Sequence, residues 1–169
     1  SLWIIAVRVS IFLSEKRYLD NSRLPSYDRL TIIKEGEMHM MIQRDSLTEN
    51  MILQGRYEVR KATHTTQVER DYEVYDREEK KEYRLKEFYP SNYCSRGADG
   101  QTVIVRGVRN QSVFEQSKEW FAQAYRQIAA SPKTKGFPEA VRLFSENNTI
   151  YVILEKSDGE RLSFPLGRI

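Results

Sequence analysis

The stretch Tyr83–Pro90, which reads YRLKEFYP, decides the fold. Apolar and polar residues alternate along it, and this period is typical of a β-strand with one buried face. Pro90 ends the strand, because proline has no backbone N–H to donate to a sheet. Lys86 lies on the buried-facing register, and a buried ammonium group without a partner is costly. From this stretch alone, a lysine at the sheet edge or in solvent is an equally good interpretation.

The flanking sequence predicts an antiparallel sheet with short connections. A charged turn at 76–80 joins the second and third strands, and Asn147-Asn148 joins the last two. We expect five strands, over residues 57–63, 70–75, 82–89, 140–145 and 149–155. Gln101–Arg106 is interpreted as a further short strand.

One helix is expected over 112–130, because Phe114, Phe121 and Tyr125 recur at helical spacing. Either Asn110 or Ser112 provides the N-cap, and Glu115 is placed to form a capping box with Ser112. The predicted fold class is therefore α+β, an antiparallel five-stranded sheet with one packed helix.

An N-terminal arm, residues 1–49, precedes the predicted domain at 50–169. Its apolar run Leu2–Leu13 contains an arginine and is shorter than the ~20 residues that cross a bilayer, so we favour a buried strand. The remnant of a signal or membrane segment is the alternative, and without it we expect no membrane association. Leu30–Lys34 and Met38–Ile42 predict a hairpin, so the arm is expected to be β-rich.

Composition excludes several classes of protein. The 27 Lys and Arg nearly balance the 24 Asp and Glu, and a net charge of +3 does not indicate nucleic-acid binding. Cys94 is the single cysteine, which excludes an internal disulfide and fits a reducing, cytoplasmic location. His39 and His64 lie too far apart for zinc spacing, so no metal site is expected.

In order and spacing, residues 53–162 resemble the N-terminal lobe of bacterial eukaryotic-like serine/threonine protein kinases. Lys86–Pro90 (KEFYP) is similar to the third-strand motif of that group, and Asn92–Arg96 is similar to the segment that follows it. The predicted helix resembles the C-helix, and Ile150–Glu155 resembles the strand that leads to the hinge.

The resemblance implies a nucleotide site whose positions have changed in this chain. Lys86 matches the lysine that reaches the phosphates and pairs with a C-helix glutamate, but that glutamate's position is Gln123. Glu119, one turn earlier, is the alternative partner. Arg84 replaces the small residue against adenine, where it either guards the adenine slot or escapes to solvent. Leu154 and Glu155 match the positions at which, in the family, the last strand of the lobe leads into the hinge.

The loop that would cover the phosphates, His64–Glu69, contains no glycine. A left-handed conformation costs roughly 1–2 kcal/mol at each non-glycine residue, and Glu69 would bring negative charge beside phosphates. The sequence also contains no His-Arg-Asp or Asp-Phe-Gly motif. We therefore expect neither ATP binding nor phosphoryl transfer by this chain.

Three functions remain open from the sequence. The first is a catalytically inactive, pseudokinase-like binding or scaffold module whose partner is another protein or a second copy, with Trp120 and Phe121 as docking or core residues. The arm would then cover the surface on which a C-terminal lobe packs. The second is the N-terminal fragment of a longer serine/threonine kinase. The third is a small α+β binding domain unrelated to kinases.

Overall fold

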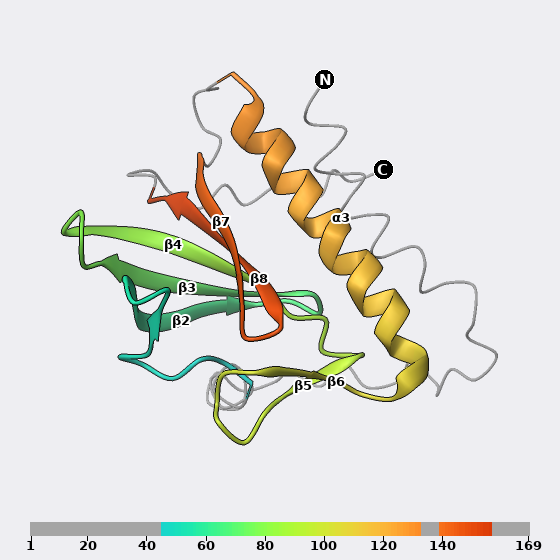
Figure 1. The fold of residues 1–169 in the computed structure, drawn as a ribbon. Coiled ribbons are helices and arrows are strands. Elements are labelled where there is room, and N and C mark those ends of the chain that lie inside the picture. The colour runs from blue at the N-terminus through green and yellow to red at the C-terminus, as the bar shows by residue number, and fades with distance from the viewer. Residues whose placement is uncertain (1–44, 133–138, 157–169) are drawn as a thin grey trace, which may run out of the picture.

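The computed structural model describes residues 45–132 and 139–156, so the predicted strands at 2–13, 30–34 and 38–42 lie outside the described residues. Within them, six strands form one antiparallel sheet in the order β1-β2-β3-β4-β8-β7. The bounds are β1 (Ile52–Leu53), β2 (Tyr57–Thr65), β3 (Glu69–Asp76), β4 (Lys81–Phe88), β7 (Ala140–Glu146) and β8 (Thr149–Glu155). Figure 1 shows helix α3 (Gln111–Ala130) running along the sheet beside β7 and β8.

The prediction of an α+β fold is confirmed, but the expected number of five strands is wrong. The sixth strand is β1, which is two residues long and pairs with Tyr57 and Glu58 at the start of β2. Two residues are too few to show alternation. Gln54 and Gly55, which follow β1, both have positive φ and turn the chain into β2.

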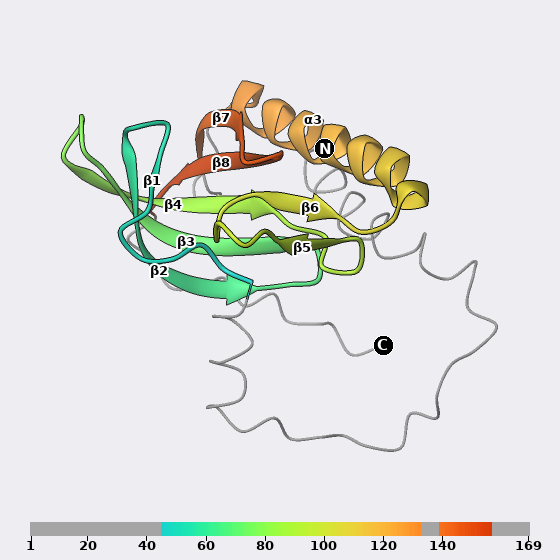
Figure 2. The ribbon, with the colours of Figure 1, turned by 60° about the horizontal axis from the view of Figure 1, so that its bottom comes forward.

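The short strand expected over Gln101–Arg106 exists as β6 (Val103–Val105), but it lies outside the main sheet. It pairs instead with β5 (Cys94–Arg96), a strand that the sequence pattern did not predict. Figure 2 shows this hairpin as a separate pair of strands. Val103 N–H donates to Asn147 O at 2.8 Å, which ties β6 to the β7–β8 turn.

The sheet carries a hydrophobic core on each face. In β4, Tyr83 and Leu85 point into the first core and Phe88 points into the second. The second core lies under α3 and includes Phe114 and Phe121. Because both faces of β4 are partly buried, its side chains alternate between the two cores and neither face is purely polar.

The sheet curls until its two edges meet. The Tyr57 ring at the start of β2 stacks on Phe144 of β7, with centroids 5.8 Å apart and planes inclined by 6°. In the turn between β1 and β2, Gln54 N–H donates to Glu146 Oε2 at 2.9 Å. The first core is therefore enclosed by the sheet itself.

Helix α3 begins at Gln111, one residue before the predicted start. The expected capping box is wrong, because Ser112 lies inside the first turn, where it cannot take the N-cap position. Asn110 is the N-cap residue, but its side chain donates to Arg106 O at 2.6 Å and does not cap the helix. Glu115 forms an ion pair with Lys118 at 2.7 Å.

Candidate functional site

Lys86 is bound by two carboxylates of the neighbouring strand. Its Nζ lies 2.9 Å from Glu69 Oε2 and 2.9 Å from Asp71 Oδ1. The Lys86 side chain is 18% exposed and that of Asp71 is 7% exposed. A mostly buried ammonium group therefore has its countercharges within the sheet, as the cost of burying a charge requires.

The register of the β3–β4 hairpin creates this cluster. Asp71 lies directly opposite Lys86, and Glu69 lies opposite Phe88, two residues further along β4. Directly paired residues on one face of an antiparallel sheet have neighbouring side chains, and diagonal neighbours are within reach of a long side chain. The ion pairs of Lys86 thus form between β3 and β4, and the lysine does not need a partner from helix α3 to balance its charge.

Electrostatics favour the charged form of this lysine. Desolvation lowers the pKa of Lys86, but the attraction of Tyr125, Glu69 and Asp71 outweighs it, so the pKa lies above its ordinary value. Lys86 is a fixed cation in this site rather than a candidate general base.

Arg84 belongs to the same cluster. Its Nη2 lies 3.4 Å from Asp71 Oδ2, and its side chain is 41% exposed. Two cations, Lys86 and Arg84, thus share Asp71, while Glu69 balances the second positive charge. The cluster contains two positive and two negative side chains and is neutral overall.

The C-helix position does not take part in this cluster. Gln123 is exposed, and its Nε2 donates to Glu119 Oε1 within α3 at 3.4 Å. Glu119 also pairs with Arg126 at 2.9 Å. Both candidate partners from the helix are therefore engaged on its exposed face.

The two hinge-like positions have different environments. Leu154 is fully buried in the second core and lies opposite Arg84 in the sheet register. Glu155 forms an ion pair with Lys81 at 2.6 Å on the sheet surface. The structure thus brings Arg84, Lys86 and Leu154 close together on β4 and β8.

The loop corresponding to the phosphate-covering loop is a closed hairpin turn. Thr66 N–H donates to Glu69 O at 2.9 Å, and the Thr66 hydroxyl accepts from the backbone N–H of Val68 and Glu69. Tyr89 N–H donates to Val68 O at 2.8 Å, and Ser91 N–H donates to Gln67 O at 2.9 Å. The backbone of this turn is bound to the segment that follows β4.

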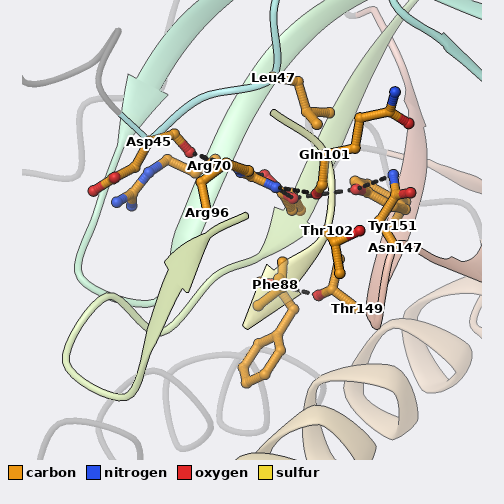
Figure 3. Close-up of polar contacts among 12 residues, drawn as sticks. Asp45, Leu47, Arg70, Phe88, Arg96, Gln101, Thr102, Asn147, Thr149 and Tyr151 are labelled. Atoms are coloured by element: carbon orange, nitrogen blue, oxygen red, sulfur yellow. Dashed lines mark hydrogen bonds and ion pairs between the residues drawn. The ribbon is translucent and has the colours of Figure 1, made fainter. Parts of the chain in front are cut away.

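A second charged cluster lies on the other face of β4. The fully buried Glu87 forms a two-point ion pair with Arg96 of β5, at 2.6 and 2.7 Å. Tyr72 O–H donates to Glu87 Oε2 at 2.7 Å, and Tyr151 O–H donates to Glu87 Oε1 at 3.2 Å. Figure 3 shows Arg96 and Tyr151 converging on this network.

Sequence reasoning did not identify the partner of Lys86, although a signal was present. The charged turn at 76–80 was predicted correctly, and pairing outward from Asp76 and Lys81 places Asp71 opposite Lys86. The Glu87–Arg96 pair had no comparable signal, because it depends on where the β5–β6 hairpin packs.

Two features expected of other functional classes are not seen in the described residues. Across 45–132 and 139–156, there is no group of three or more His, Cys, Asp or Glu side chains that could hold a metal ion. None of the helices described is long and apolar enough to cross a membrane.

Similarity to known proteins lies in the fold. No protein-family model and no curated protein matches the sequence. The structure is similar to that of PpkA-294 in its apo form, a bacterial serine/threonine kinase, with a TM-score of 0.63 and 23% sequence identity. The similarity covers 66% of this chain and 39% of the PpkA-294 chain. It supports a protein-kinase N-lobe-like fold, as the sequence had indicated.

Proposed function

We propose that this chain is a kinase-N-lobe-like module that has lost nucleotide binding and acts as a binding or scaffold module. The observation that carries the proposal is the pairing of Lys86 with Glu69 and Asp71 at 2.9 Å each. The lysine that would bind a ligand's phosphates has its charge balanced by the protein.

Electrostatics explain why this pairing opposes nucleotide binding. A polyphosphate at Lys86 would lie beside two carboxylates, and like charges at such short range repel one another strongly when partly buried. Displacing the carboxylates would leave Asp71, which is nearly buried, without its ion pair.

The closed turn gives independent support. Backbone groups that cradle phosphates must be free to point their N–H groups at the ligand. Here the N–H groups of Thr66, Val68 and Glu69 are hydrogen-bonded within the turn. Glu69 also brings its carboxylate to Lys86 from this position.

Titration with ATP and magnesium tests the proposal, with calorimetry and thermal unfolding as readouts. We expect no saturable heat and no rise in melting temperature, whereas a ligand at 100 times its Kd would add about 2.7 kcal/mol. Lys86→Met is the matched control for non-specific effects. Saturable binding by the wild-type chain that this substitution removes would contradict the proposal.

A second candidate function is the N-terminal part of a longer serine/threonine kinase. It is favoured by the comparison in which this chain spans 39% of PpkA-294. The reading frame downstream of the Ile169 codon tests it, since a His-Arg-Asp and an Asp-Phe-Gly motif would be required there. The pairing of Lys86 predicts weak nucleotide binding for that longer protein as well.

A further inference from the structure

The segment Asp45–Leu47, here called the strap, precedes β1 and is docked on the sheet. Its leucine side chain is 4% exposed and belongs to the first core. Arg96 donates to Asp45 O from Nη2 at 2.7 Å and from Nε at 3.1 Å. Leu47 N–H donates to the Tyr72 hydroxyl at 3.1 Å. At least three hydrogen bonds and the buried Leu47 side chain therefore hold the strap.

The groups that receive the strap form a socket whose polar members are fixed by other contacts. Arg96 is held by Glu87 and also donates from Nη1 to Gln101 O at 2.9 Å. Tyr72 donates its hydroxyl hydrogen to Glu87, which leaves the hydroxyl oxygen to accept from the strap. Figure 3 shows Asp45 beside Arg96. Because these donors and acceptors are already oriented, docking requires little reorganisation of the socket.

A short hinge, Thr48–Asn50, connects the strap to β1, and its residues are exposed. Asn50 has φ +67°, a left-handed conformation that asparagine adopts more often than most side-chain-bearing residues but that is still less favourable for it than for glycine. Asn50 N–H donates to Val59 O at 2.7 Å, which fixes the C-terminal end of the hinge on β2. The strap thus reaches its own socket only through a tight turn.

We propose that the strap exchanges between two copies of this chain, so that each strap fills the partner's socket in a dimer. A second copy supplies the same backbone groups and the same leucine, so every strap contact described above is preserved. Straightening the hinge would release the left-handed conformation at Asn50, and strained short hinges favour such exchange. This inference rests on the proposed binding role and identifies the partner as the chain itself.

Two substitutions at the exposed Asn50 test the exchange in opposite directions. Asn50→Gly lowers the cost of the left-handed conformation at position 50 and therefore favours the closed monomer. Asn50→Val raises that cost, because a β-branched residue rarely adopts positive φ, and therefore favours exchange. Both keep the N–H that donates to Val59. We expect the dimer of Asn50→Val to have a Kd at least about tenfold lower than that of Asn50→Gly. Light scattering after size exclusion, over a range of concentrations, measures the difference.

Leu47→Ala provides the matched control, because it removes the apolar anchor of the strap and leaves the hinge intact. We expect it to reduce the dimer in the Asn50→Val background. A synthetic peptide covering residues 43–51 should bind this full-length double variant and raise its melting temperature, while a peptide with alanine at position 47 should not. Failure of peptide binding would show that the socket accepts no strap from outside.

Four outcomes would overturn the exchange: failure of the peptide to bind, equal dimer affinity of the two Asn50 variants, a dimer that persists undiminished with Leu47→Ala, or only monomers in every variant. The nucleotide titration is independent of these measurements. A chain that remains monomeric and does not bind ATP would therefore refute the exchange alone, whereas Lys86-dependent ATP binding would refute the proposed function.

Discussion

The Glu87 carboxylate binds the Arg96 guanidinium at two points, and the two side chains are 0% and 6% exposed. The pair connects β4 to the β5–β6 hairpin. Glu87→Gln removes the charge and leaves Arg96 buried without its counterion, so we expect a loss of about 3–5 kcal/mol in the free energy of unfolding. Urea denaturation measures this loss.

A suitable comparison is Tyr151→Phe, which removes the hydroxyl that donates to the same carboxylate at 3.2 Å and accepts from Asn147 Nδ2 at 3.2 Å. We expect the loss of these two neutral-donor hydrogen bonds to cost only about 1–2 kcal/mol. If the two substitutions destabilised the protein equally, the ion pair would not be the main contribution of this network.

Substituting the lysine of the other cluster tests its structural role. Lys86→Met leaves two carboxylates, Asp71 and Glu69, beside Arg84 as the remaining cation of the cluster, and we expect a loss of about 1–3 kcal/mol in the free energy of unfolding. Adding Asp71→Asn should restore part of that stability by removing one of the two carboxylates. A double variant less stable than Lys86→Met would argue against the pairing at 2.9 Å.

Restoring an acid on the helix should not rebuild a nucleotide site. Gln123 is exposed and donates to Glu119 within α3, so Gln123→Glu should change stability by no more than about 0.5 kcal/mol. Calorimetry should detect no ATP binding by this variant. Phe121→Ala is the contrasting helix substitution, with an expected loss of about 3–5 kcal/mol, because its ring packs on Phe88 at 5.4 Å.

Stability should fall at alkaline pH. Burial raises the pKa of the Cys94 thiol to about 12 and also raises the pKa of Tyr89 and Tyr151 above the ordinary value. In the unfolded chain these groups ionise near about 8.5 and about 10, so above those values the unfolded state binds fewer protons than the folded state. Their contribution is fully present below about pH 8.5 and is lost as pH rises toward 12.

Urea midpoints measured between pH 7 and pH 11 test this dependence, and absorbance of tyrosinate reports ionisation directly. Native protein should show less tyrosinate at pH 11 than unfolded protein at the same pH. An unchanged urea midpoint across this range would contradict the buried environment of these groups.

Much of the fold could be predicted, because local patterns determine it. Alternation in 57–63, 70–75 and 82–89 identified three neighbouring strands, and the spacing of Phe114 and Phe121 identified the helix. The failures involve long-range packing. Ile52–Leu53 becomes a strand only because β2 lies beside it, and Ser112 misses the N-cap because the helix begins one residue earlier.

The candidate site was predictable in part for the same reason. Lys86 was identified from its strand, and the need of its charge for a partner followed from burial. The expected partner lay on the helix, but the register of a local hairpin gave Asp71 instead. Arg96 could not be assigned, since its partner depends on how a hairpin outside the main sheet packs.

The contact between the first and last edges of the sheet affects the order in which the chain can fold during synthesis. Central strand β4 pairs on one side with β3, made just before it, and on the other with β8, made more than sixty residues later. During synthesis, the Tyr57 ring cannot stack on Phe144, and Leu85 cannot pair with Ile153, until β7 and β8 have been made. Such distant pairings slow folding, so we expect the half-made chain to expose aromatic residues, and to be prone to aggregation, until β8 has been synthesised.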